Sequence, residues 1–413
     1  MNLGLLDLRV IESSAFVAAP LAGLTLAQFG ADVIRIEMIG GGIDYGRLPL
    51  MPSGRSLYWT GLNKAKRSIA IDLRRPEGRE LVQALVTADG ENGGVLLTNV
   101  ASKWLAHSDL ATRRADLITC TIEGNQDGST AVDYTVNCAA GYPAMTGTGS
   151  IDAPVNHVLP AWDIACAFQA GFAIVSAADR RRRTGKGAEL RIALSDVAFS
   201  MVSHLGVAAE AELLGESRPA IGNHIYGAFG RDFATTDGKR VMVAAISAGQ
   251  WKALVAACGI EAEVAALQLR CGLDFDREAD RYQGRDAIAA LVEPWCAARD
   301  FAEVEAVFNR HRVCWGQYRT TTDLLANDNR VSLTNPIWER IETTGVGSHS
   351  AAGTPIRAQG ESRRAMTPAP LLGQHTDEVL LDVLGLDSGA VGRLHDAGIV
   401  AGAERDPTAA GGR

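Results

Sequence analysis

The chain has 413 residues, 47% hydrophobic and 21% charged, and this length exceeds what one hydrophobic core usually supports, so we expect two domains. A net charge of −8 disfavours nucleic acid as a partner, because nucleic-acid binding requires a basic surface. The seven cysteines are odd in number and scattered, which argues against a disulfide framework and against a zinc site.

The first residues show no basic segment followed by an apolar core. The longest uncharged run, residues 13–31, contains Pro20 and Gly23, so it does not resemble a membrane span. We therefore expect a cytoplasmic protein with no membrane partner.

Strand and helix patterns alternate along the first third of the chain. Residues 8–37 predict strand, loop, helix and strand, and a third strand is expected at 66–73. Apolar residues at helical spacing follow at 74–86, and two further strands are expected at 93–100 and 114–124. This alternation predicts a parallel sheet covered by helices on both faces.

A long apolar helix is expected after Asp163, ending at the basic run Arg180–Arg183 before Gly185. Cations at a helix C-terminus next to a glycine cap fit the helix dipole, so we prefer this interpretation to a phosphate site. Asp237-Gly238 predicts the turn of a hairpin in a second domain. The expected boundaries are a large domain at 1–205, a linker at 206–224, a small domain at 225–325, and a linker with a return to the large domain at 326–413.

A dinucleotide site is disfavoured, although Glu37 stands where a ribose-binding acid is expected. The loop at 12–20 contains no glycine, so the G-x-G-x-x-G fingerprint is missing. The sequence also lacks a G-x-x-x-x-G-K-[ST] motif, an H-x-x-x-H pair and a G-x-S-x-G elbow.

Asp163 is a single carboxylate between Pro160 and a long stretch without another charge. The structural interpretation is a helix N-cap that accepts backbone N–H bonds. The functional interpretation is a nucleophile, since a helix N-terminus keeps a carboxylate ionised and such a group can attack a thioester. The residues alone favour the N-cap.

The chain resembles the class III CoA-transferases, the group of formyl-CoA transferase, carnitine-CoA transferase and α-methylacyl-CoA racemase. The resemblance is carried by segments 29–37, 63–82, 98–100, 182–201 and 369–386, together with the Asp163 segment. It implies an α/β fold with a Rossmann-like large domain built from both chain ends, a small α+β domain, and an interlocked homodimer. It also implies that Asp163 is the catalytic nucleophile, which forms an acyl anhydride and then an aspartyl-CoA thioester. No permanently bound cofactor and no metal are implied, and coenzyme A enters as part of the substrate.

The resemblance places CoA along the first strand-to-helix turn and the strand ends that follow it. Three positions differ from the commoner family residues, which leaves Arg74, Arg35 or Lys64 as cations for the CoA phosphates. The implied contacts are Ala15, Val17, Ala18, Met38, Ile71, Arg74, Asn99 and Val100.

Racemisation is disfavoured, because the histidine that family racemases require is replaced by Val132. A closer resemblance within the family implies CoA transfer between the two carboxyl groups of one branched C4 unsaturated diacid. An anhydride hydrolyses in open water, so we expect a lid at 222–232. Its candidate substrate residues are His224, Tyr226, Gly227 and Arg231, with His224 or Arg231 holding the distal carboxylate.

The structural alternative for His224 and Arg231 is a linker charge that pairs with Asp232 or Asp237. Two alternative functions also stay open. One is intermolecular CoA transfer between a short-chain acyl-CoA and a carboxylic acid. The other is a non-catalytic acyl-CoA-binding protein, which retention of Asp163 disfavours.

Overall fold

The computed structural model describes residues 5, 7–100, 102–148, 151–361 and 363–409, and the chain divides into two compact units. The first unit comprises residues 1–140, 157–209 and 329–413. The second comprises residues 141–156 and 210–328. Residues 141–156 therefore belong to the second unit, although they lie within the predicted large domain at 1–205.

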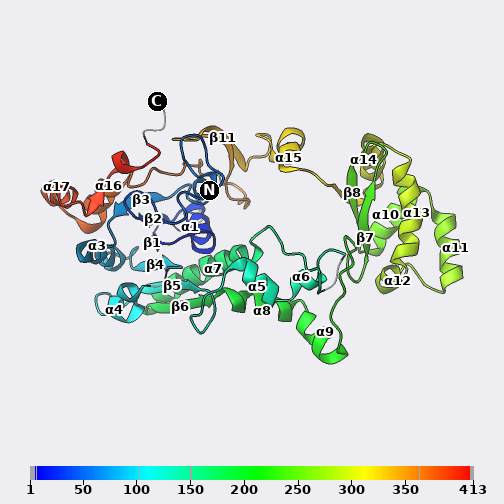
Figure 1. The fold of residues 1–413 in the computed structure, drawn as a ribbon, viewed down its shortest axis with the longest axis horizontal. Coiled ribbons are helices and arrows are strands. Elements are labelled where there is room, and N and C mark those ends of the chain that lie inside the picture. Colours follow the sequence, from blue (N-terminus) through cyan, green and yellow to red (C-terminus); the bar gives the residue numbers. More distant parts are fainter. Residues whose placement is uncertain (1–4, 6, 101, 149–150, 362, 410–413) are drawn as a thin grey trace. The chain divides into compact units, whose positions relative to one another are not determined.

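The first unit is built on a seven-stranded sheet with the order β12-β3-β2-β1-β4-β5-β6. Figure 1 labels the strands from β3 to β6 in this order. All neighbours are parallel except β12, which pairs antiparallel with β3. The prediction of a parallel α/β sheet is confirmed. The strands are β1 (Arg9–Ser13), β2 (Asp32–Glu37), β3 (Arg67–Ile71), β4 (Val95–Thr98), β5 (Ile118–Glu123), β6 (Ala188–Ala193) and β12 (Val400–Ala401).

The direction of winding reverses at β1. This strand pairs with β2 on one side, where Arg9 faces Asp32, and with β4 on the other, where Ile11 faces Leu96. In open parallel sheets, ligands bind outside the carboxyl ends of the strands at such a switch point. The loops after β1 and β4 therefore mark the expected position of a site.

Helices cover both faces of this sheet. Alternate strand residues such as Ile11 and Ile34 face a core formed with α3, α4, α16 and α17. Helices α1 and α7 pack against each other over the other face. The helices of this unit are α1 (Ala18–Gln28), α2 (Leu57–Leu62), α3 (Pro76–Thr87), α4 (His107–Ala111), α5 (Asp133–Ala139), α7 (Ala161–Thr184), α8 (Leu194–His204), α16 (Thr376–Leu384) and α17 (Ser388–Asp396).

The long helix α7 ends as the sequence predicts. Gly185 adopts φ of 68° and donates to the carbonyl of Arg181. The Arg181 guanidinium itself binds the carbonyls of Gly93 and Gly94 at 2.8 and 3.2 Å. The basic run is thus a helix terminus. Among the described helices, α7 meets the length and composition of a membrane span, a test that core helices of soluble proteins also pass.

The C-terminal segment is tied to the N-terminal half of the first unit. The Asp406 carboxylate accepts hydrogen bonds from the Tyr45 hydroxyl at 2.7 and 2.8 Å and from the Leu372 N–H at 2.7 Å. It also lies 3.4 Å from the buried guanidinium of Arg55. Residues far apart in sequence therefore form one domain. A hairpin of β10 (Trp338–Thr343) and β11 (Gly347–Ala352) belongs to the same unit.

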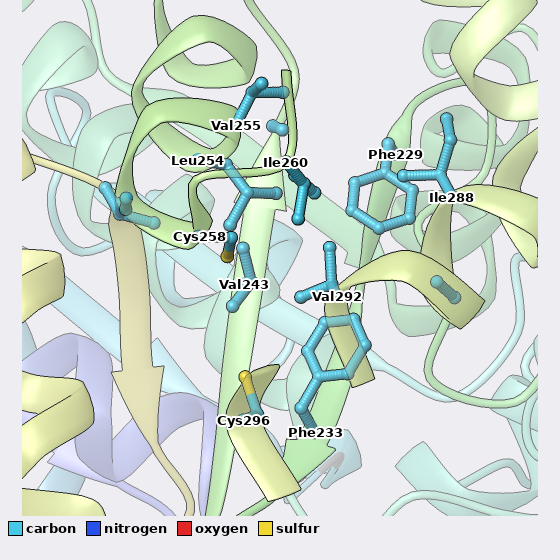
Figure 2. Packing of buried hydrophobic residues seen from close by; sticks show 14 of the residues in the cluster. Phe229, Phe233, Val243, Leu254, Val255, Cys258, Ile260, Ile288, Val292 and Cys296 are labelled. Carbon is cyan, nitrogen blue, oxygen red and sulfur yellow. The ribbon is translucent and has the colours of Figure 1, made fainter. Parts of the chain in front are cut away.

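The second unit combines a three-stranded antiparallel sheet, β7-β8-β9, with helices. Asp237 and Gly238 form the predicted hairpin turn, where Gly238 has φ of 76°. Side chains from β7, β8 and helices α10 and α13 point toward one another in its core, as Phe233, Val243, Leu254 and Val292 show (Figure 2). Its elements are α6 (Tyr142–Met145), β7 (Phe229–Ala234), β8 (Arg240–Ala245), α10 (Ala248–Cys258), α11 (Glu261–Cys271), α12 (Glu278–Gln283), α13 (Arg285–Ala297), α14 (Phe301–His311), β9 (Cys314–Gln317) and α15 (Thr321–Asn327), and α9 (Val207–Leu214) leads into it.

Candidate active site

The loop after β1 is held against the end of β4 by one amide side chain. Asn99 accepts the N–H of Ala15 at 2.9 Å and donates to the carbonyl of Ala15 at 2.7 Å. The next residue, Phe16, has a positive φ of 64°, which is uncommon for a bulky side chain. Its N–H is fixed by the Asp44 carboxylate at 3.0 Å. The switch point thus carries a strained loop with defined partners.

A buried charge network supports this loop. Arg35 in β2 lies among three carboxylates, with Glu12 at 3.1 Å, Asp44 at 3.2 Å and Glu37 in closest contact. Lys66 pairs with Glu12 at 2.9 Å. One sequence interpretation is therefore corrected, since Arg35 is not available to a CoA phosphate. The contact of the Glu37 carboxylate with Arg35 agrees with the prediction that a dinucleotide site is disfavoured.

A cavity of about 510 Å³ opens at the switch point. Its wall comes from the loop after β1, the loop after β2, α2, α5 and the start of α7. The side chains that matter for chemistry are Phe16, Arg47, Tyr58, Asp133, Tyr134 and Asp163.

Asp163 is the third residue of α7, and it is half-buried in the cavity wall. The N-cap interpretation is wrong: Pro160 occupies that position, and it makes no side-chain cap. Asp133 of α5 performs the capping instead, because its Oδ2 accepts the N–H groups of Trp162 at 2.7 Å and Asp163 at 3.1 Å. The Asp163 carboxylate is thereby left for another role.

Burial, and after it the negative charge of Asp133, raise the pKa of Asp163 to about 7, while the positive charge of Arg47 acts in the opposite direction. The expectation that the helix N-terminus keeps this carboxylate ionised is therefore corrected. Near neutral pH the group exists in both protonation states. A carboxylate with a raised pKa is also a stronger nucleophile once it is deprotonated.

Arg47 is the one cation among the described residues that line the cavity, and sequence reasoning missed it. Its guanidinium lies 4.9 Å from the ring centroid of Tyr58 and 5.4 Å from that of Phe16. Two aromatic faces hold the side chain without neutralising its charge. The site can therefore accept an anionic group close to Asp163.

The positions predicted to contact CoA lie at the carboxyl ends of β1 to β4 or in the loops that follow them, except Ala18, which begins α1. Ile71 is fully buried. Arg74 is 79% exposed and makes a bidentate pair with Asp72 at 2.8 and 3.0 Å. Lys64 donates to the carbonyl of Ala352 at 3.4 Å, and burial lowers its pKa. Ala15, Val17, Ala18 and Asn99 surround the switch point, and Met38 and Val100 are exposed.

The four predicted substrate residues all belong to the second unit. Tyr226 donates to Glu210 at 2.5 Å, and His224 lies 3.5 Å from Asp286. Gly227 has φ of 79°, which a side chain would strain.

Arg231 stacks over Phe233 at 5.5 Å rather than pairing with a neighbouring carboxylate. Asp232 pairs instead with Arg240, and Asp237 with Lys239 at 3.4 Å. The structural alternative for Arg231 is therefore wrong.

Within the described part of the chain, no group of three His, Cys, Asp or Glu side chains is placed to hold a metal ion. The chemistry available to the cavity is that of a carboxylate, a guanidinium and aromatic walls.

The sheet carries a half-buried carboxylate at its switch point, and the chain belongs to CoA-transferase family III. The sequence profile of that family matches residues 5–376. The chain is 51% identical over 400 residues to the 2-methylfumaryl-CoA isomerase of Chloroflexus aurantiacus, covering 96% of this chain and 98% of that protein.

More distant relatives agree with this assignment. A formyl-CoA:oxalate CoA-transferase of Rhodopseudomonas palustris is 26% identical over 430 residues, covering 97% of this chain and 98% of that protein. The solved structure of a CAIB/BAIF family protein from Brucella suis has a TM-score of 0.74 and 26% identity. It covers 93% of this chain, and the match spans 100% of that chain.

Proposed function

We propose that this protein moves CoA between the C1 and C4 carboxyl groups of mesaconyl-CoA (2-methylfumaryl-CoA), with Asp163 as the nucleophile. The observation that carries the proposal is the half-buried Asp163 carboxylate, whose pKa is raised to about 7, beside Arg47 in a cavity at the switch point. The high identity to 2-methylfumaryl-CoA isomerase supports the choice of substrate.

The reaction begins when a carboxylate oxygen of Asp163 attacks the thioester carbonyl. The carbon–sulfur bond breaks, CoA leaves as a thiolate, and the acyl group forms a mixed anhydride with Asp163. The thiolate then attacks the aspartyl carbonyl of this anhydride. The products of this half are an aspartyl-CoA thioester and the free diacid.

The second half repeats these steps with the other carboxylate of the same diacid. That carboxylate attacks the aspartyl thioester and releases the thiolate, which in turn attacks the new acyl carbonyl. Asp163 is regenerated as a carboxylate. No oxidant is needed and no net proton transfer occurs, so the site requires orientation and exclusion of water rather than a base.

Arg47 supplies a reason for a diacid substrate. While one end of mesaconate reacts at Asp163, the other end carries a negative charge that needs a partner in a poorly hydrated cavity. We assign this role to Arg47, which lies on the wall that also carries Asp163. The guanidinium also favours retention of the freed diacid until its second carboxylate reacts.

CoA binding by Ala15, Val17, Ala18, Met38, Ile71, Arg74, Asn99 and Val100 is part of the same proposal. Their support is the position of the loops at the carboxyl ends of adjacent strands, where nucleotide-like ligands bind in open α/β sheets. CoA enters with the substrate, and no permanently bound cofactor is required.

Closure by residues 222–232, with His224, Tyr226, Gly227 and Arg231 near the acyl group, is also proposed. Its support is chemical, since an anhydride survives only where water is excluded. His224 adds one observation: its Nδ1 is buried and has no hydrogen-bond partner among the described residues.

The assembly that we propose is an interlocked cytoplasmic homodimer. Phe168 and Phe172, one turn apart on α7, are 53% and 75% exposed, and Phe199 of α8 is also exposed. An apolar surface of this kind is normally covered by a partner. Light scattering of Phe172→Glu tests this: a monomer supports the dimer, and an unchanged oligomer places the interface elsewhere.

The test of function is to incubate the purified protein with mesaconyl-C1-CoA and to follow the C4 ester by chromatography. We expect conversion by the wild type and none by Asp163→Ala. Isotopically labelled free mesaconate is added in parallel. Its incorporation into the ester would establish intermolecular transfer instead, and no conversion would remove the substrate assignment.

A further inference from the structure

Asp133 is shared between the start of α7 and a histidine. Its side chain is 2% exposed, and its two oxygens have separate partners. Oδ2 accepts the N–H groups of Trp162 and Asp163, while Oδ1 lies 2.6 Å from Nε2 of His157. A carboxylate held at both oxygens cannot rotate, so Oδ2 stays oriented toward the N–H groups at the start of α7.

We propose that His157 is a positioning residue for Asp163, acting through Asp133. The inference rests on the proposed function of Asp163. Asp163 is among the described residues that line the cavity, and His157 is not. His157 fixes the orientation of the Asp133 carboxylate, which in turn fixes the N–H groups of residues 162 and 163. The position of this backbone determines where the Asp163 side chain leaves the helix. A displacement of about 1 Å at a reacting group costs up to about 100-fold in rate.

His157 also affects the charge near the nucleophile. The hydrogen bond from Nε2 offsets part of the negative charge of Asp133, and that charge raises the pKa of Asp163. Other titratable groups near Asp163 are Arg47 after β2, Tyr58 of α2, and Cys166 one turn later in α7. Glu123 of β5 and Tyr134 of α5 line the same cavity. Arg47 acts in the opposite direction to Asp133, and neither Tyr58 nor Cys166 is ionised near neutral pH, because burial raises the pKa of each to about 12. Loss of the His157 bond therefore moves the pKa of Asp163 upward.

The test compares His157→Phe, which removes the hydrogen bond, with His157→Gln, which keeps an N–H donor. We expect His157→Phe to lower kcat at pH 7 by about 10-fold with little change in KM, since ground-state binding is untouched. The midpoint of the acidic limb of kcat/KM should rise by about half a pH unit or more. His157→Gln should recover most of kcat and the wild-type midpoint.

The matched control is His395→Phe. His395 makes a similar contact with a carboxylate, at 2.7 Å from Asp377, but it joins α17 to α16. Its kcat and midpoint should equal those of the wild type. Wild-type kinetics for His157→Phe would overturn the proposal. Equal losses in His157→Phe and His157→Gln with an unchanged midpoint would also overturn it, because they indicate packing alone.

A second readout does not depend on activity. The difference in melting temperature between the protein with Asp163 and its Asp163→Asn variant is measured as a function of pH, in the full-length protein without substrate. The series is recorded once with His157 intact and once in the His157→Phe background. We expect the pH at which the difference develops to be higher when His157 is replaced. Identical pH profiles would refute the positioning role. If the pH profile shifts but the wild-type protein does not convert mesaconyl-CoA, the effect of His157 on Asp163 is established and the proposed reaction is rejected.

Discussion

Replacement of the nucleophile should stabilise the protein at alkaline pH. The pKa of Asp163 rises from 3.8 to about 7 on folding, so the folded state binds the proton more tightly than the unfolded state. The stability linked to this proton is complete below pH 4 and is lost as the pH rises through about 7. Three pH units at about 1.36 kcal/mol each give an upper bound of about 4 kcal/mol, and water near this half-buried carboxylate reduces the cost to about 2–4 kcal/mol.

Asp163→Asn keeps the shape of the side chain and removes the charge, so it should avoid this cost at pH 8. With an unfolding entropy of about 2.1 cal/mol/K per residue, a change of 1 kcal/mol in the free energy of unfolding shifts the Tm of this chain by about 1 °C. We therefore expect Tm at pH 8 to rise by about 2–4 °C in scanning calorimetry without substrate, and by about one third as much at pH 5. Asp382→Asn, at an exposed position on α16, is the control and should show no such pH dependence. A destabilised Asp163→Asn, or equal changes at the two pH values, would refute the reasoning.

Three other predictions concern the same unit. The kcat/KM of the wild type should increase with pH and level off above about 7, because only the ionised Asp163 attacks; a flat profile from pH 5 to 8 would contradict this. Arg47→Gln should lower kcat/KM for mesaconyl-CoA by about 10- to 100-fold, the value of one charge-assisted hydrogen bond, with Arg47→Lys intermediate. If both Arg47 variants keep wild-type activity, Arg47 does not bind the substrate. Asp406→Ala should cost about 3–5 kcal/mol, because it leaves the buried Arg55 uncompensated, and a change in Tm below 1 °C would argue against a structural role.

The sheet was predictable because its signals are local. The alternation of β-branched strands with amphipathic helices, such as the helix that follows Pro76, is encoded in consecutive residues, and so is the Gly185 helix end. Asp163 was identified through the family resemblance. The residues alone favour an N-cap, which the structure rejects.

The partners of Asp163 could not be predicted, since they come from distant segments. Asp133 lies 30 residues before Asp163, and nothing in the pattern around it indicates that it caps another helix. Arg47 belongs to a loop without periodicity, and its role depends on two aromatic rings from separate segments. The raised pKa of Asp163 follows from the competition between burial, Asp133 and Arg47, which only the three-dimensional arrangement settles.

The two-residue strand β12 has a consequence for synthesis on the ribosome. Val400 and Ala401 complete the sheet edge at β3, and Asp406 closes the contacts with Tyr45 and Leu372. About 330 residues separate the translation of β3 from that of its edge partner, so the nascent sheet must wait with an unpaired edge while the whole second unit is made. Chaperone binding to the nascent chain should therefore persist until the last segment leaves the exit tunnel.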